Sequence, residues 1–307
     1  MISYIVKRLA IAVPTLLLLI ILSFLLMRAA PGGPFTQERQ LPAAVLANLE
    51  AKYGLDQPLW HQLFSYVWGI VAHFDFGPSF IYKDRTVNEI IAQGFPVTLT
   101  YGTVSFIVAV IVGVSLGIAA AIRHNSWLDY LAVGISIGAQ VLPNFVMAPI
   151  LLLVFTFWLG WLPGGGWEHG QWQYMVMPVI ALSTSFMASI ARITRASMLE
   201  VLTSNHIRTA RAKGLPERKV IMRHALKPAL LPVLSYLGPA FVTMITGSVV
   251  VDFFFSTGGI GRSFVDSALN RDYAVMLGIT ILVGGLTILF NLVVDILYGW
   301  IDPKIRY

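Results

Sequence analysis

Three cations, Arg208, Arg211 and Lys213, lie close together in the sequence, and such a group can form ion pairs with the carboxylates of a partner protein. Gly214 follows them and can adopt the left-handed conformation that ends a helix, while Pro216 is suited to the first turn of a new helix. This order of residues predicts two short helices that meet at a bend. The candidate docking loop comprises Arg208, Thr209, Ala210, Arg211, Lys213, Gly214, Leu215 and Pro216.

The charges around this bend suit the helix dipoles. Arg211 and Lys213 fall in the last turn of the first predicted helix, where the dipole favours cations, and Glu217 falls in the first turn of the second, where it favours a carboxylate. A solvated loop of general positive charge would also account for the cations. It would not account for Gly214 and Pro216, and from these residues alone both interpretations stay open.

Residues that could perform catalysis are not arranged for it. A phosphate-binding Walker A loop requires Lys followed by Ser or Thr, and none of the seven lysines has such a neighbour. The six histidines include no pair with the spacing of a helical zinc-protease motif, and the absence of cysteine excludes thiolate catalysis and thiolate metal sites. We therefore expect a chain without catalytic residues, metal or cofactor of its own.

The elements that position this loop are membrane spans. The chain is 57% hydrophobic and 12% charged with a mean hydropathy of +0.75, whereas an ordinary globular protein is about 25% charged. A helix needs roughly 20 mostly apolar residues to cross a bilayer. The expected fold class is all-α, a polytopic membrane protein with six transmembrane helices. The six segments are Leu9–Met27, Val97–Ile122, Tyr130–Leu159, Gln173–Ala191, Leu230–Val251 and Tyr273–Asp295.

The first of these segments could also be the apolar part of a cleaved signal peptide, since Lys7 and Arg8 precede it. A run from Leu9 to Met27 is longer than the roughly 7–15 residues typical of such a peptide. We therefore expect an uncleaved span.

The distribution of Lys and Arg predicts the orientation. A cytosolic N-terminus places 14 of the 21 cations on the cytosolic side, so we expect both termini in the cytosol. The basic charge then reflects topology and docking, and nucleic acid is not an expected partner. The expected organisation is a first span at 1–30, an external segment at 31–96, a transmembrane domain at 97–301 with a cytosolic coupling loop at 198–228, and a cytosolic tail at 302–307.

Within the external segment, two short helices are expected, one from Pro42 to Lys52 ending before Gly54, and one from Pro58 to Ala72. The second has an apolar face that could pack on the bundle or bind a partner; packing is favoured. That face comprises Leu59, Leu63, Tyr66, Val67 and Ile70.

Polar residues within the predicted spans must face the bundle interior or a water-filled cavity. They are candidates for a translocation pathway, although interhelical hydrogen bonds explain each of them equally well. The candidates are Gln140, Asn144, Ser183, Thr184, Ser185, Thr246 and Asn291. Pro143 and other prolines in the spans could act as gates or simply kink helices. Asp295 is the acid clearly inside a predicted span, and it lies near one end, which disfavours self-contained ion-driven pumping.

Membrane subunits of type I ABC importers share this pattern of six spans, no ATP site and a bent basic loop. The loop resembles their "EAA" coupling loop, with Arg208, Thr209, Ala210 and Gly214 at the Glu-Ala-Ala and Gly positions and Arg208 departing from the Glu. "IRTARAKGL" followed by "HALKPALLPV", and the external "YGLDQPL" and "FDFGPSF", resemble the peptide and nickel permease branch. "GPSFIYKDRTVNEII", "ALNRDY" and "DPKIRY" are most similar to oligopeptide permease subunits.

The resemblance covers essentially the whole chain and implies a function. It implies a subunit of the bacterial inner membrane that forms the pathway for oligopeptides, beside a second homologous membrane subunit. It also implies an external peptide-binding protein and two ATPase subunits, which hold ATP and Mg²⁺. Dipeptide, nickel or glutathione uptake is the alternative within the branch, and a stand-alone ion-coupled carrier or a purely structural assembly protein the alternative outside it.

Overall fold

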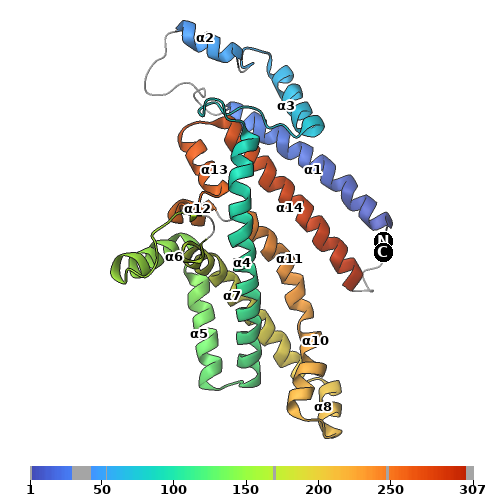
Figure 1. Ribbon diagram of the computed structural model, residues 1–307. Helices are drawn as coiled ribbons and strands as arrows, with labels where there is room; N and C mark the ends of the chain where they lie inside the picture. The colour runs from blue at the N-terminus through green and yellow to red at the C-terminus, as the bar shows by residue number, and fades with distance from the viewer. Residues whose placement is uncertain (1, 30–42, 53, 169–170, 247–248, 302–307) are drawn as a thin grey trace. The chain divides into compact units, whose positions relative to one another are not determined.

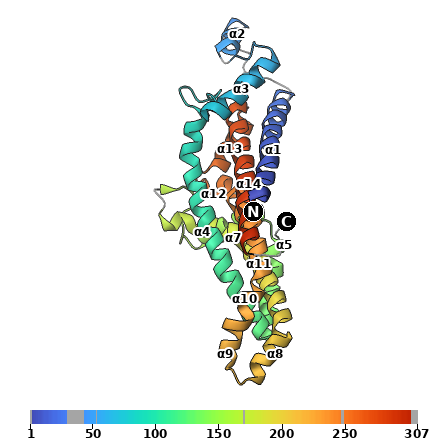
Figure 2. The ribbon, with the colours of Figure 1, turned by 90° about the vertical axis from the view of Figure 1, so that its right-hand side faces the viewer.

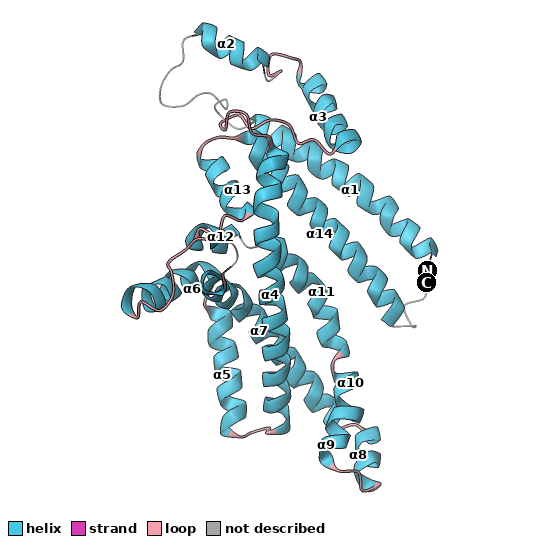
Figure 3. Cartoon of the chain, viewed as in Figure 1, coloured by secondary structure: helices cyan, strands magenta, loops and turns pink. Residues whose placement is uncertain are grey.

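The computed structural model describes residues 2–29, 43–52, 54–168, 171–246 and 249–301. Over these residues the chain folds into helices joined by loops, which confirms the expected all-α class (Figures 1 and 3). The predicted tail at 302–307 and most of the first external residues lie outside the described part. The helices are α1 (Ile2–Ala29), α2 (Ala43–Lys52), α3 (Leu59–His73), α4 (Val87–Ile122), α5 (Trp127–Val141), α6 (Asn144–Leu151), the π-helix η1 (Leu152–Trp158), α7 (Trp172–Leu202), α8 (Asn205–Ala212), α9 (Glu217–Lys219), the π-helix η3 (Val220–Ala225), α10 (Leu226–Ala229), α11 (Leu231–Thr246), α12 (Val249–Phe255), α13 (Ile260–Leu269) and α14 (Tyr273–Ile301).

Four described helices are long and apolar enough to cross a membrane, namely those containing Val6–Ala29, Val87–Ile122, Trp172–Leu202 and Tyr273–Val294. Two further pairs of helices qualify if each bent pair counts as one span, which gives up to six. The expected number of spans therefore agrees with the structure, but the predicted segment Tyr130–Leu159 is not a single helix.

The predicted span Tyr130–Leu159 was wrong as a continuous helix. The segment consists of α5, followed by α6 and η1 together, and these two parts meet at an angle of 101° at Leu142 and Pro143. Leu142 has the extended angles φ −85° and ψ 107°, as expected for a residue before proline, and Pro143 caps the start of α6. The predicted span Leu230–Val251 contains α11 and the start of α12, and residues 247–248 between them lie outside the described part.

The chain forms two compact units, one of Met1–Thr98 with Gly258–Tyr307 and the other of Leu99–Thr257. In the first unit α1 packs along α14, and α13 also packs on α14 (Figure 1). The predicted short helices are confirmed as α2, with Gly54 after it at φ +65°, and α3, with Pro58 as its N-cap. The predicted packing of the α3 face is confirmed for Leu63, Tyr66, Val67 and Ile70, whereas Leu59 is exposed.

A buried carboxylate fixes the N-terminal end of α14 in this unit. Asp272 accepts hydrogen bonds from the hydroxyl of Ser79 at 2.5 Å and from the backbone N–H of Phe80 at 3.1 Å. The same side chain accepts a hydrogen bond from the N–H of Val275 at 3.3 Å in the first turn of α14. The "GPSF" and "NRDY" sequences, far apart in the chain, therefore meet at one capped helix end.

In the second unit α4 crosses α7 closely, as the spacing of Gly113 and Gly117 predicts. A Cβ atom at Gly113 would lie 2.8 Å from the carbonyl oxygen of Met187, and one at Gly117 would lie 2.6 Å from that of Ala191. The same α7 packs against α5, α6 and α11. The helix that leads into the candidate docking loop is thus held on several sides by neighbouring helices.

Candidate functional site

The candidate docking loop starts where the chain reverses after α7. Ser204 is the N-cap of α8 with ψ 156°, so the chain leaves the helical direction there. Its hydroxyl donates to the carbonyl of Val201 at 2.6 Å and lies 2.9 Å from Nδ1 of His206. These local bonds tie α8 back to the end of α7, and together α8 and α9 form a hooked tip (Figure 2).

The bend at Gly214 is formed as predicted. Gly214 has φ +74°, and no atom outside its chain neighbours lies within 4 Å of where its Cβ would be. At the bend, the N–H of Gly214 donates to the backbone carbonyl of Arg211 at 2.9 Å, and the N–H of Leu215 donates to the backbone carbonyl of Ala210 at 3.4 Å. Pro216 then caps α9, with the N–H of Lys219 bonded to its carbonyl at 2.8 Å. Glycine is required at position 214 by the backbone angle alone, not by lack of space.

An ion pair closes the bend. Nη2 of Arg211 lies 2.6 Å from Oε1 of Glu217, and Nε lies 3.1 Å from Oε2. The side chains are 44% and 54% exposed, so this bidentate pair contributes only about 0.2–1 kcal/mol. Hydrogen bonding to the partner raises the pKa of Arg211 and lowers the pKa of Glu217. Arg211 was predicted to face a partner protein, but its guanidinium is instead engaged within the loop.

The inner face of α8 is apolar. Ile207 is fully buried and Ala210 is 6% exposed, while Arg208 and Thr209 between them are exposed. The two buried side chains join a hydrophobic cluster that includes residues from the ends of α4 and α7 and from η3 and α10. The cluster comprises Ala121, Met198, Ile207, Ala210, Val220, Ile221, Ala225 and Ala229, with Leu215 packed against it.

The predicted loop residues fall into three groups. Ala210 and Leu215 support the loop from inside, and Gly214 and Pro216 shape it. Arg208, Thr209 and Lys213 are exposed on the outer side, and among the described residues no ion pair joins Arg208 or Lys213 to a carboxylate. The arrangement presents cations on a firmly packed helix.

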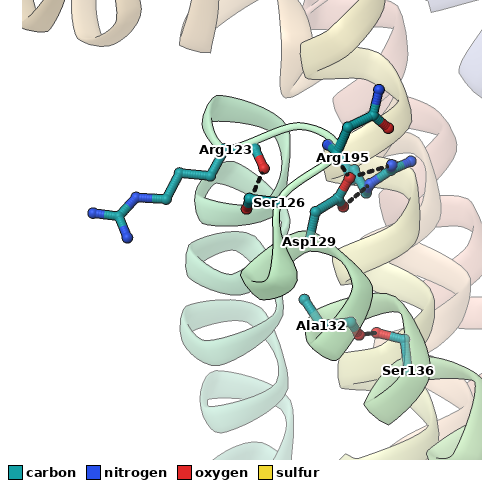
Figure 4. Close-up of polar contacts among 7 residues, drawn as sticks. Arg123, Ser126, Asp129, Ala132, Ser136 and Arg195 are labelled. Atoms are coloured by element: carbon teal, nitrogen blue, oxygen red, sulfur yellow. Dashed lines mark hydrogen bonds and ion pairs between the residues drawn. The ribbon is translucent and has the colours of Figure 1, made fainter.

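A second ion pair holds the α4–α5 hairpin against α7 (Figure 4). Nε and Nη2 of Arg195 lie 2.5 Å and 2.8 Å from the two carboxylate oxygens of Asp129, which is 1% exposed. Asp129 also accepts a hydrogen bond from the backbone N–H of Asn125 at 3.0 Å. Asn125 lies in the hairpin turn and has φ +59°. Asp129 was not singled out from the sequence, although its position three residues after the hairpin turn and the cation of Arg195 on α7 were visible.

A third buried carboxylate, Asp252, was not singled out from the sequence. Asp252 is fully buried on α12 and accepts the phenol hydrogen of Tyr101 at 2.6 Å and the hydroxyl hydrogen of Thr257. The predicted span ended one residue earlier, at Val251, so this acid was left out. The side chain of Asp295 lies outside the described part.

The structure shows the local surroundings of the pathway candidates. The hydroxyls of Ser183, Thr184 and Thr246 each donate to a carbonyl of their own helix, and Gln140 is exposed at the end of α5. Asn291 belongs to the other compact unit. The hydroxyl bonds agree with a structural role for these three side chains. Asn144 opens α6 beside the bend, and Ser185 is half-buried on α7.

Comparison with protein families gives two matches that together cover almost the whole chain. Residues 113–307 match the family described as binding-protein-dependent transport system inner membrane component. Residues 1–102 match the N-terminal region of the membrane components of binding-protein-dependent transport systems.

Similar curated proteins cover the same length. The chain is 58% identical over 307 residues to the oligopeptide transport system permease protein OppB of Salmonella typhimurium and 57% identical to that of Escherichia coli, with 100% of both chains covered in each case. It is 42% identical over 306 residues to the dipeptide transport system permease protein DppB of Bacillus subtilis, covering 100% of this chain and 98% of that protein.

Similar solved structures support the fold. The MetNI methionine ABC transporter in inward-facing conformations matches with a TM-score of 0.60 at 16% identity, over 70% of this chain and 97% of that chain. An amino acid ABC transporter with histidines matches with a TM-score of 0.56 at 17% identity, over 68% and 93%. At these identities the comparison bears on the fold alone.

Proposed function

The chain belongs to the family of inner membrane components of binding-protein-dependent transport systems, and on that premise we propose that its 198–228 loop couples oligopeptide transport to separate ATPase subunits. As a multi-pass permease subunit of an ABC importer, it provides the passage for the substrate. ATP binding would close the ATPase pair, and the movement would pass through the loop into the transmembrane helices.

The observation that supports this coupling role is the construction of the hooked tip. A docking element must transmit force without deforming, and the tip is suited to that in three ways. Ile207 and Ala210 fix α8 on an apolar cluster, Gly214 sets the reversal, and the Arg211–Glu217 pair closes it. The exposed cations Arg208 and Lys213 would then meet carboxylates of an ATPase subunit.

Asp129 and Arg195 would extend this coupling beyond the loop. Arg195 lies on α7 two helical turns before the reversal at Ser204, so a displaced tip would pull on α7 there. The bidentate, buried pair with Asp129 would carry the same displacement to the α4–α5 hairpin. Two spans would therefore respond together rather than one.

We propose oligopeptides as the substrate class because two full-length relatives at 57–58% identity are named oligopeptide permease proteins. Relatives named dipeptide permeases are more distant, at 42% and 40% identity. The complex would contain this subunit, a second homologous membrane subunit, two ATPase subunits holding ATP and Mg²⁺, and an external peptide-binding protein. Both termini would be cytosolic, with 31–96 external and 97–301 forming the transmembrane domain.

The test is reconstitution of the importer in lipid vesicles. We expect uptake of labelled oligopeptides that requires ATP and the ATPase subunits, with weaker uptake of dipeptides. The control is the same chain without ATPase subunits under an ion gradient, which should transport nothing. Peptide uptake by the isolated chain would instead identify a stand-alone carrier, and uptake of dipeptides in preference to longer peptides would overturn the substrate assignment.

A further inference from the structure

Helix α3 has an apolar side that packs on two membrane-spanning helices. Leu63, Tyr66, Val67 and Ile70 point to one side of the helix, as expected from their spacing of three and four residues. They contact a cluster at the adjoining ends of α1 and α14, whose buried members are Ile20, Phe24, Leu277 and Ile281. The apolar side chains of this face are therefore covered by the fold.

A second side of α3 is also apolar but is not covered. Trp60, Phe64, Trp68 and Val71 recur at intervals of four, four and three residues and are 71%, 66%, 58% and 58% exposed. The rings of Phe64 and Trp68 stack with centroids 6.5 Å apart. Removing large apolar side chains from water is favourable, so four of them in one stripe favour a position away from water.

The remaining side of α3 is polar. His61, Gln62 and Ser65 lie there, and the amide nitrogen of Gln62 donates to the carbonyl of Gln57 at 2.6 Å. The guanidinium of Arg28, at the end of α1, donates to the amide oxygen of the same Gln62. One helix therefore presents separate faces to a protein core, to apolar surroundings and to polar surroundings.

The level of α3 along α1 is that of a membrane surface. The apolar span Val6–Ala29 is 24 residues long, or about 36 Å at 1.5 Å per residue, against a hydrocarbon thickness of about 30 Å. Phe24 and Arg28 therefore lie near the boundary between hydrocarbon and headgroups, where a cation is well placed. The guanidinium of Arg28 lies 5.8 Å from the ring centroid of Phe24.

An apolar groove connects the exposed side of α3 with α1. It has a volume of about 510 Å³ and is lined by Ile21 of α1 and by Trp60, Leu63, Phe64 and Val67 of α3. On α1 itself, exposed leucines continue the apolar surface along the span in both directions from Ile21. They are Leu18, Leu22, Leu25 and Leu26.

We propose that the face of α3 formed by Trp60, Phe64, Trp68 and Val71 lies in the interfacial layer of the bilayer and binds glycerophospholipids. Its continuity with the surface of a membrane span favours lipid over a protein partner, and exposed Trp and Phe suit the interfacial layer. The polar face then meets water. Helix α3 would anchor the end of α1 and hold the following loop at the membrane surface, whichever side of the membrane this is. The inference is independent of the proposed coupling loop.

Spin labels test the proposal, because the chain contains no cysteine. Single-cysteine variants Phe64→Cys, Trp68→Cys and, as the control on the polar face of the same helix, Ser65→Cys would be labelled in the full importer in vesicles of phosphatidylethanolamine and phosphatidylglycerol. We expect labels at 64 and 68 to collide with oxygen, which concentrates in lipid, and to be shielded from a water-soluble nickel chelate. Their depth should be about 5–10 Å into the headgroup and acyl boundary. The label at 65 should favour the nickel chelate.

Two results would overturn the proposal. Equal access of the nickel chelate to positions 64 and 65 would place the aromatic face in water. Shielding of position 64 from both oxygen and the nickel chelate would mean that a protein partner covers it. Both positions are exposed in the structure, so labelling should leave the fold intact, and co-purification of the partner subunits checks this for each variant.

Discussion

Gly214→Val should disable coupling while leaving the chain in the membrane. Gly214 has φ +74°, and a Cβ there would meet no atom within 4 Å, so the substitution adds no steric clash with the rest of the fold. The cost is the backbone strain of a β-branched residue at positive φ, about 1–3 kcal/mol. If the strain acts only on the hooked form of the tip and is released in an opened form, the ratio of hooked to opened tips falls by roughly 5- to 150-fold.

Gly160→Val is the matched control. Gly160 has φ +62° and likewise nothing within 4 Å of its Cβ position, but it lies in the loop after η1 and not in the coupling loop. The assay is peptide-stimulated ATP hydrolysis by the reconstituted importer, with the amount of co-purified ATPase recorded. We expect loss of stimulation in Gly214→Val and near-normal stimulation in Gly160→Val. Normal coupling in Gly214→Val, or an equal loss in both variants, would refute the reasoning.

Three further experiments test the roles assigned to the charged residues and the predicted orientation. Arg211→Glu should open the bend because the new carboxylate repels Glu217, and the added change Glu217→Arg should restore peptide-stimulated ATP hydrolysis. Arg208→Glu should also reduce peptide-stimulated ATP hydrolysis, but Glu217→Arg should not restore it. Identical responses of the two arginine variants to Glu217→Arg would contradict their separate roles. Asp129→Asn should leave the guanidinium of Arg195 without its carboxylate partner and destabilise the chain by about 3–5 kcal/mol. The loss should appear as a lower unfolding temperature. An unchanged unfolding temperature would mean that the Asp129–Arg195 ion pair does not hold the α4–α5 hairpin against α7. A cysteine at Ser204 should react with a membrane-impermeant reagent in inverted vesicles and not in intact cells, and the reverse pattern would overturn the orientation.

The bend could be predicted from the sequence because its causes are local. Gly214 and Pro216 restrict their own backbone angles and those of their neighbours, so the reversal follows without knowledge of the surrounding helices. The partner of Arg211 depends on the exact direction in which the chain leaves the bend. Only the folded loop shows that its guanidinium reaches Glu217 instead of pointing outward.

The break within the predicted span Tyr130–Leu159 could not be seen from its continuous apolar composition. Tyr130–Leu159 satisfies the length and composition of a single helix, yet Pro143 turns the chain by 101° because neighbouring helices give α6 its own packing surface. Asp252 was missed for a related reason. A carboxylate at the edge of a predicted span has no partner visible in the sequence, since Tyr101 is 151 positions away.

The pathway candidates show where sequence reasoning has least power. Polarity at membrane depth predicts that Ser183, Thr184 and Thr246 are satisfied within the protein, and they are, by carbonyls of their own helices. Such a bond requires neither a pathway nor a neighbouring helix. Their role in transport stays a prediction.

The most direct test of the central claim is site-specific photocrosslinking from the coupling loop to an ATPase subunit. A single cysteine replacing Thr209, which is exposed on α8, would carry a short benzophenone group in the assembled importer. A cysteine replacing Trp161, exposed in the loop after η1, is the control. We predict a crosslink to an ATPase subunit from position 209 and none from position 161. An intact, ATP-hydrolysing complex that gives no crosslink from position 209 would contradict the coupling assignment.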